Sequence, residues 1–241
     1  MGDQLHMTPG PIALVGSGEY LPVMQEVEAA LIHGRTPKYV QIPTAAAPEG
    51  PDSVSYWIEL GRAQAQRIGV EPISVVAHNR DDADDTQIAE QVRDAGLIYL
   101  SGGNPSFLAN TLRDTKLWRE IESAWRDGAA LAGCSAGAMA LADHIPTLRL
   151  PTQPATRGLG LLPHIRVLPH FDRMFAHVPD FFTRFMKVPD GVHVIGIDED
   201  TAIVGGPIKW EVQGRQSAWL FVDGHRHEYV AGATLVTPIL V

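Results

Sequence analysis

The residues best suited to chemistry lie in the segment 133–138, which has the sequence Gly-Cys-Ser-Ala-Gly-Ala. Apolar runs precede and follow it, so the pattern predicts a strand, a tight turn and a helix. A Gly-x-Ser-x-Gly turn of this kind holds a serine hydroxyl clear of the backbone, and the helix N-terminus behind it offers N–H groups to a developing oxyanion. Ser135 is therefore the predicted nucleophile. The alternative is a glycine-rich turn that only joins a buried strand to a helix.

The spacing of the glycines separates Ser135 from its neighbour Cys134. Glycines stand two residues before and two residues after Ser135, whereas Ala132 and Ala136 occupy the corresponding positions around Cys134. We expect Cys134 to face the core as a small apolar residue. It is the single cysteine of the chain, which excludes an internal disulfide framework and favours a reducing, cytoplasmic setting.

The elements that must position Ser135 follow from an alternation of apolar and helical patterns. Four buried parallel strands are predicted at 12–15, 39–42, 73–76 and 97–100, and a fifth leads into Ser135. Helical patterns lie at 22–33, 53–68, 86–95, 105–113 and 115–127; in the second of these, the spacing predicts core packing for Trp57, Leu60 and Ile68. The alternation predicts an α/β fold with a doubly wound, mostly parallel sheet, whose ligands bind beyond the carboxyl ends of the strands.

The last third of the chain has a different pattern. Apolar runs at 192–197, 201–204 and 218–222 are separated by turn residues and predict antiparallel strands that extend the sheet. The stretch 144–165 contains four prolines and predicts one long loop beside the site. We expect residues 8–241 to form one α/β domain and residues 1–7 to be an expression remnant.

Two further turns lie at the predicted ligand-binding edge. The segment 101–105, Ser-Gly-Gly-Asn-Pro, follows the fourth strand, and its paired glycines would expose N–H groups that complete an oxyanion hole beside Ser135. A simple strand-to-helix turn explains the segment equally well. The segment 16–19, Gly-Ser-Gly-Glu, lacks the third glycine of a dinucleotide-binding fingerprint, so we expect a tight turn there.

A serine nucleophile needs a base, and the base needs a partner that fixes its tautomer. His170 ends a short apolar run that predicts another strand, so its imidazole can reach the same edge. His144, in the helix predicted after Ser135, would be carried away, and His225 lies in a late hairpin. The acidic segment 198–200 follows a predicted strand and could supply the partner; an acidic turn facing water is the alternative.

Composition limits the possible partners. The net charge of −9 argues against nucleic-acid binding and means that an anionic substrate would need a dedicated arginine. No segment resembles a membrane span or a secretory signal. No pair of histidines has the spacing of a metalloprotease zinc site, and we expect neither a metal nor an organic cofactor.

Four segments together resemble the dipeptidase E and cyanophycinase family of serine peptidases: 101–104, 133–138, 169–171 and 194–202. They occur in the order of the family. The resemblance implies a flavodoxin-like, class I glutamine amidotransferase-like fold, with Ser135 as nucleophile, His170 as base and Glu199 as the orienting carboxylate. It also implies that the amides of Gly103 and Ala136 form the oxyanion hole. Alternation along a continuing strand would likewise send Glu199 to the face opposite its two acidic neighbours.

The resemblance implies a small peptide substrate with an acidic residue. The dipeptidase branch cleaves dipeptides with N-terminal aspartate, which an arginine after the histidine holds. Arg173 and Arg184 are the candidates here, although neither matches that spacing, and Asn104 is a third substrate-binding candidate. The 198–202 segment looks more like the cyanophycinase branch, which usually has a glutamine where this chain has Pro169. The substrate therefore stays open.

Two other functions remain open at this point. One is an α/β-hydrolase-like esterase in which Ser135 works with His225 and either Asp172 or Asp190. The other is a non-catalytic protein of the amidotransferase-like superfamily that binds a small ligand at the same edge.

Overall fold

The computed structural model of the 241-residue chain describes residues 8–146, 156–174 and 188–239. The predicted expression remnant, 1–7, and Arg184 therefore lie outside the described residues. The stretch predicted as one long loop is described only in part. It includes two short paired strands, β6 (His144–Ile145) and β7 (Thr156–Arg157).

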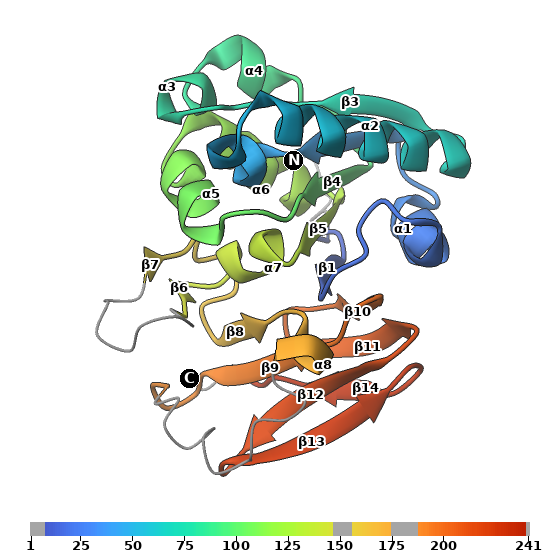
Figure 1. The fold of residues 1–241 in the computed structure, drawn as a ribbon, viewed down its shortest axis with the longest axis vertical. Helices are drawn as coiled ribbons and strands as arrows, with labels where there is room; N and C mark the ends of the chain where they lie inside the picture. The colour runs from blue at the N-terminus through green and yellow to red at the C-terminus, as the bar shows by residue number, and fades with distance from the viewer. Residues whose placement is uncertain (1–7, 147–155, 175–187, 240–241) are drawn as a thin grey trace, which may run out of the picture.

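An eight-stranded sheet forms the centre of the described chain, in the order β14-β11-β10-β1-β5-β4-β2-β3 (Figure 1). Its parallel part consists of β1 (Ile12–Val15), β5 (Ala130–Cys134), β4 (Leu97–Leu100), β2 (Lys38–Ile42) and β3 (Glu71–Ser74). The antiparallel part consists of β10 (Thr201–Gly205), β11 (Lys209–Gly214) and β14 (Thr234–Val236). The predicted α/β fold, with a mostly parallel sheet and antiparallel C-terminal strands, is confirmed.

Helices cover both faces of this sheet. Side chains alternate between the two faces along each strand, so each face has apolar side chains against which helices pack. Ala13 and Val15 of β1 pack on one face with α1 (Gln25–Ile32) and α2 (Pro51–Ile68). Ile12 and Leu14 pack on the other face, whose helices are α5 (Pro105–Leu112), α6 (Lys116–Arg126) and α7 (Ala136–Ala140). The remaining helical segments are short: η1 (Pro22–Met24), η2 (Thr44–Glu49), α3 (Arg80–Ala83), α4 (Thr86–Glu90) and α8 (Phe171–Met174).

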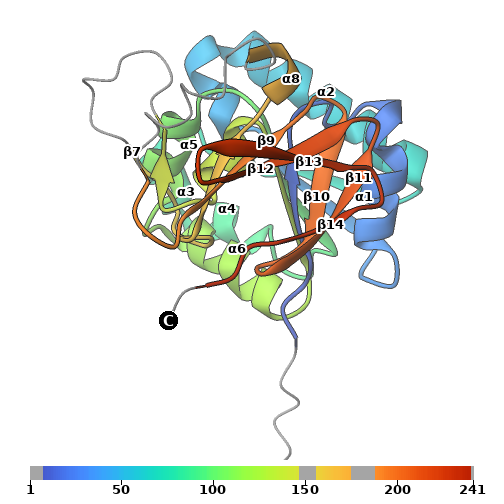
Figure 2. The ribbon, with the colours of Figure 1, turned by 90° about the horizontal axis from the view of Figure 1, so that it is seen from below.

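Not all the late strands join the central sheet, and that part of the prediction was wrong. A second, four-stranded sheet has the order β13-β12-β9-β8. Its members are β8 (Ile165–Leu168), β9 (His193–Ile197), β12 (Ser217–Val222) and β13 (His225–Val230). Of the three late strands predicted, only β10 joins the central sheet, where it pairs with β1, and β8 and β9 run parallel. Figure 2 shows β9, β12 and β13 crossing in front of β10 and β11.

Several strand ends lie together at one edge of the eight-stranded sheet. The carboxyl ends of the neighbouring strands β1, β5 and β4 lie there, because the three strands are parallel. β10 starts at the same edge, since it is antiparallel to β1 and its Ala202 is opposite Val15. The turn from β9 to β10 therefore lies beside the turn that follows β5. Among the described helices, none is long and apolar enough to cross a membrane.

Gly137 allows α7 to pack against β4. A Cβ added there would clash with the carbonyl oxygen of Leu100, which belongs to the backbone and has no rotamer to change. We expect Gly137→Ala to lower the free energy of unfolding by about 1–3 kcal/mol, as overpacking does in well-packed cores. Urea unfolding followed by circular dichroism measures this change.

Gly69→Ala is the control for the Gly137 prediction. Gly69 has φ +80°, but a Cβ there meets no atom within 4 Å. Only the backbone penalty of roughly 1 kcal/mol then applies. A Gly137→Ala protein at least as stable as the wild type would contradict the packing described here.

Candidate active site

The turn between β5 and α7 holds Ser135 in a conformation that few non-glycine residues adopt, with φ 48° and ψ −105°. Such a backbone costs on the order of 1–3 kcal/mol and persists only where the surrounding contacts fix it. The Ser135 amide donates to the carbonyl oxygen of Val15 at 2.9 Å. Gly133 lets the helix approach so closely that a Cβ there would lie 2.6 Å from the carbonyl carbon of Gly137. The turn leaves Ser135 half-buried at the edge of the sheet.

Cys134 faces the core, as the glycine spacing predicts. Its side chain is fully buried, and its Sγ–H donates to Oε2 of Glu19 at 2.7 Å. Burial, with the Glu19 carboxylate close by, raises the pKa of the Cys134 thiol well above its usual range. Because the thiolate is the nucleophilic form, this cysteine stays protonated and unreactive.

His170 lies between Ser135 and Glu199. Its Nε2 is 3.0 Å from Oγ of Ser135, and its Nδ1 is 3.1 Å from Oε1 of Glu199. In the tautomer that satisfies both contacts, Nδ1–H donates to the carboxylate and Nε2 accepts the hydroxyl proton. Such an arrangement can take a proton from the serine and stabilise the imidazolium that forms, as acyl transfer requires.

Contacts from two segments hold Glu199 at this place. Its amide donates to Oδ1 of Asp172 at 2.9 Å, and its carbonyl oxygen accepts from Nε2 of Gln216, also at 2.9 Å. Its Oε2 accepts from Nε of Arg173 at 3.2 Å. The sequence predicted a role for Asp172 only in the esterase alternative and predicted no role for Gln216, because neither residue belongs to a recognisable motif.

Asp198, the acidic residue directly before Glu199, has partners other than His170. Asp198 is buried and accepts from the amide of Ser217 at 3.2 Å and from Nε1 of Trp219 at 2.9 Å. Burial raises the pKa of Asp198, although these hydrogen bonds oppose the shift. The expectation of alternation along a continuing strand was wrong, because β9 ends before Asp198 and a turn follows. The turn, rather than the pleat of a strand, sends Glu199 toward His170.

The two glycine amides after β4 differ, although the sequence suggested an exposed pair. Gly102 is buried, and its N–H donates to Oε1 of Glu19 at 2.9 Å. Gly103 is exposed and has φ +131°, which favours glycine. Ala136 occupies the first position of α7, where an N–H has no acceptor within the helix. The assignment of Gly103 and Ala136 to an oxyanion hole stays a prediction.

The predicted substrate-binding residues that the structure describes already have protein partners. Oδ1 of Asn104 caps α5 by accepting from the amide of Phe107 at 2.9 Å. Arg173 pairs through Nε with Glu199, and its side chain is 73% exposed. Arg184 lies outside the described residues.

The other histidines considered as bases lie elsewhere. His144 is in β6 and not in the helix after Ser135, because α7 ends at Ala140. His225 is exposed at the start of β13, in the four-stranded sheet (Figure 1). Since His170 makes the contact with the Ser135 hydroxyl, nothing in this geometry supports the esterase arrangement.

A cavity of about 250 Å³ opens onto Ser135 and His170. Its wall includes Trp57 and Leu60 of α2, for which the helical spacing predicted core packing. Both do pack against the core under α2, but only partly, and their other sides line the cavity. Helical periodicity identifies the face of α2 that packs on the core, but it does not indicate that a cavity lies along the edge of that face.

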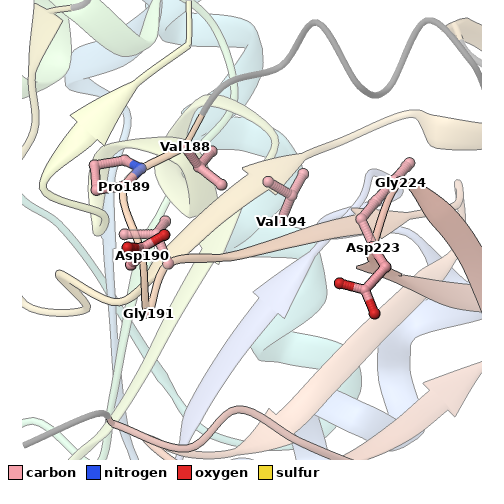
Figure 3. Close-up of a pocket in the computed structure, with 9 residues that line it drawn as sticks. Val188, Pro189, Asp190, Gly191, Val194, Asp223 and Gly224 are labelled. Atoms are coloured by element: carbon pink, nitrogen blue, oxygen red, sulfur yellow. The ribbon is translucent and has the colours of Figure 1, made fainter.

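A second hollow of about 260 Å³ lies on the four-stranded sheet (Figure 3), and its described lining does not include Ser135. The turn before β9 and the turn between β12 and β13 flank it, with Val194 between them. Its described lining includes Asp190 and Asp223 but no serine, cysteine or histidine. Among the described residues, no group of three or more His, Cys, Asp or Glu side chains could hold a metal ion.

A buried polar network lies beside the glycine turn that follows β4. The hydroxyl of Tyr20 is 2.7 Å from Oγ of Ser101, next to the glycine turn. The amide of Tyr20 donates to Oε1 of Glu28 at 3.2 Å, and the hydroxyl of Tyr39 donates to its Oε2 at 2.7 Å. Burial raises the pKa of Glu28 to about 7, and the two hydrogen bonds oppose part of that shift.

The raised pKa of Glu28 predicts a pH-dependent stability. The unfolded carboxyl loses its proton near pH 4.5, whereas the folded one keeps it to about pH 7. The native state therefore binds more protons in this window, and its stability falls as the pH rises through it, by roughly 3 kcal/mol. Urea unfolding at pH 5 and pH 8 should show this loss in the wild type and a much smaller one in Glu28→Gln. Glu26→Gln, exposed on the same helix, is the control; equal pH dependence in all three proteins would refute the assignment.

Comparisons with known proteins identify relatives of this chain. Residues 12–206 match the model of peptidase family S51. The chain is 41% identical to a peptidase from an acI-B1 Actinobacterium of known crystal structure, with a TM-score of 0.86 over 96% of this chain and 98% of that one. It is 28% identical over 162 residues to the cyanophycinase of Trichormus variabilis and 27% identical over 189 residues to that of Geminocystis herdmanii.

The matches to the cyanophycinases are partial. They cover 63% and 75% of this chain, and only 54% and 66% of the two cyanophycinases. The family match, in contrast, begins at the first residue of β1 and ends just after β10, so it includes every strand end at the Ser135 edge. The resemblance seen in the sequence is thereby confirmed, and the chain belongs to peptidase family S51.

Proposed function

We propose that this protein is a serine peptidase that hydrolyses a peptide bond through Ser135, His170 and Glu199. The observation that carries the proposal is the pair of contacts through His170, 3.0 Å to the Ser135 hydroxyl and 3.1 Å to the Glu199 carboxylate. Both lie within the range that a nucleophile, base and orienting acid require. Membership of family S51 supports the same conclusion.

The reaction proceeds by acyl transfer. Oγ of Ser135 attacks the carbonyl carbon of the peptide bond while Nε2 of His170 takes the hydroxyl proton. The C–N bond then breaks, and His170 returns that proton to the leaving amine, which leaves an ester on Ser135. Water attacks the ester with His170 again as base, and the acid product and free serine result. Glu199 keeps Nδ1 of His170 protonated and stabilises the imidazolium throughout.

Backbone amides stabilise the oxyanion of each tetrahedral intermediate. The exposed Gly103 amide and the Ala136 amide at the start of α7 are the donors. The buried Gly102 amide takes no part, because Glu19 already accepts from it. Gly102 instead anchors the turn that presents Gly103.

Small peptides are the substrates that we expect. The cavity beside Ser135, about 250 Å³, lies just below the range of sites for drug-sized ligands and suits one or two residues of a peptide. A preference for an acidic residue stays a prediction. Arg173 is the described cation that could meet such a residue: one of its nitrogens contacts Glu199, and most of its side chain is exposed.

Ser135→Ala should lower kcat for a hydrolysed peptide on the order of a million-fold while the protein stays folded, because an alanine fits the small-residue turn. A fluorophosphonate probe, with the labelled peptide identified by mass spectrometry, should mark Ser135 in the wild type.

Two comparisons make this test specific. Cys134→Ala should keep hydrolysis, because the buried thiol takes no part; loss of activity in Cys134→Ala with activity retained in Ser135→Ala would reverse the assignment. His170→Ala should abolish hydrolysis and His225→Ala should not, and the opposite result would revive the esterase alternative. A folded wild type that neither reacts with the probe nor cleaves peptides would indicate a non-catalytic binding protein.

The acidic preference is tested with the dipeptides Asp-Leu and Asn-Leu, which differ by one charge. If Arg173 binds the acidic side chain, the wild type should have a kcat/KM for Asp-Leu roughly tenfold or more above that for Asn-Leu. Arg173→Ala should lose most of that ratio. Arg215→Ala is a matched control, since Arg215 is similarly exposed and pairs with Asp200. If Arg173→Ala slows both substrates equally, Arg173 acts only by holding Glu199, and the acidic preference is wrong for this residue.

A further inference from the structure

We infer that the cavity beside Ser135 is a subsite for a bulky apolar or aromatic side chain of the substrate, on one of the two residues that flank the scissile bond. This inference rests on the proposed function and adds a substrate class to it. Leu21, Tyr56, Trp57 and Leu60 form the apolar wall of the subsite.

The position of the cavity connects it with bond cleavage. It is lined by Ser135 and His170 and also by the glycine turn that presents the Gly103 amide. A peptide carbonyl held by Ser135 and the oxyanion amides must therefore have one of its flanking side chains at the mouth of this cavity. The apolar wall and the two reacting side chains line the same space.

The chemistry of the wall favours an apolar occupant. The described lining contains no lysine or arginine, so nothing in it neutralises an acidic side chain. Glu19 is the single carboxylate of that lining, and its two oxygens already accept from the Gly102 amide and from Cys134. Leu21 and Tyr56 remain 39% and 59% exposed, and a substrate side chain that covers them would remove apolar surface from water.

The aromatic part of the wall is held in place before any substrate binds. The Trp57 ring makes an edge contact with Tyr56, with centroids 5.6 Å apart, and another with the buried Tyr20 at 6.2 Å. The carbonyl oxygen of Trp57 also accepts from Nε2 of Gln41 at 3.1 Å. Tyr20 in turn contacts Ser101, which precedes the glycine turn. The wall and the oxyanion turn therefore share one rigid support, which lowers the entropic cost of binding.

The test uses two series of peptides, Asp-X and X-Leu, with Phe, Leu, Ala and Lys at position X. The two series vary the residue after and before the scissile bond. We expect Phe to exceed Ala in kcat/KM by roughly tenfold to a hundredfold in one series, since a well-fitting apolar pocket discriminates by such factors. Tyr56→Ala should lose most of that ratio, and Tyr56→Phe, which keeps the ring, should retain it.

Val230→Ala is the matched control, because Val230 has the same exposed fraction as Tyr56, 59%, but lies on β13 in the other sheet. It should keep the wild-type ratio. Isothermal titration of Ser135→Ala with the Phe and Ala peptides supplies a readout that needs no turnover, and it should show tighter binding of the Phe peptide.

The outcomes separate this inference from the proposed function. Hydrolysis with no preference for Phe over Ala in either series overturns the subsite and leaves the peptidase standing. A preference that survives in Tyr56→Ala also overturns the assignment to this wall. If no peptide is cleaved and the Ser135→Ala protein still binds the Phe peptide more tightly, the subsite stands and the catalytic proposal fails. Equal or absent binding of both peptides, without cleavage, rejects both.

Discussion

Close backbone packing around the Ser135 turn is the constraint on which the rest of the site depends. Gly133 and Gly137 carry no side chain, so the start of α7 can approach both β5 and the last carbonyl of β4. At this approach the chain passes from β5 into α7 through Ser135, which takes a positive φ. The turn then stands at the edge where β1, β5 and β4 end and β10 begins. A packing requirement inside the protein thus fixes where a hydroxyl is presented at its surface.

The parallel half of the fold could be predicted because its signals are local. Apolar runs and helical periodicity place β1, β2 and β4 to within a residue. β3 begins two residues before its predicted start, since it is an edge strand whose ends are decided by pairing with β2. The local sequence of each late strand does not indicate which of the two sheets the strand joins. That choice depends on β8, whose partner β9 follows it in the sequence only after a segment that lies outside the described residues.

Within the site, motifs and family resemblance led to Ser135, His170 and Glu199, but not to the groups around them. Two adjacent glycines look equivalent in a sequence, and only Glu19, distant along the chain, makes the Gly102 amide differ from that of Gly103. The same applies to Asp172, which fixes the backbone of Glu199 from the start of α8. Such pairings follow from tertiary contacts between remote segments, which no spacing rule in one sequence encodes. The negative net charge of the chain predicted that an anionic substrate would need an arginine, but Arg173 is already paired with the Glu199 carboxylate.

The division of these side chains between two sheets has a mechanical consequence. Ser135 and the amides beside it belong to the eight-stranded sheet, whereas His170 follows β8 of the four-stranded sheet, and Glu199 lies in the turn that crosses from one to the other. The hydrogen bond between Ser135 and His170 therefore joins the two layers at the site. A slip of one layer past the other by about 1 Å would interrupt the proposed proton transfer, which can cost on the order of a hundredfold in rate, with every strand still paired. Under the proposed mechanism, catalytic competence and secondary structure are thus separable properties of this molecule, and residues between the layers, remote from Ser135, gain control over the rate.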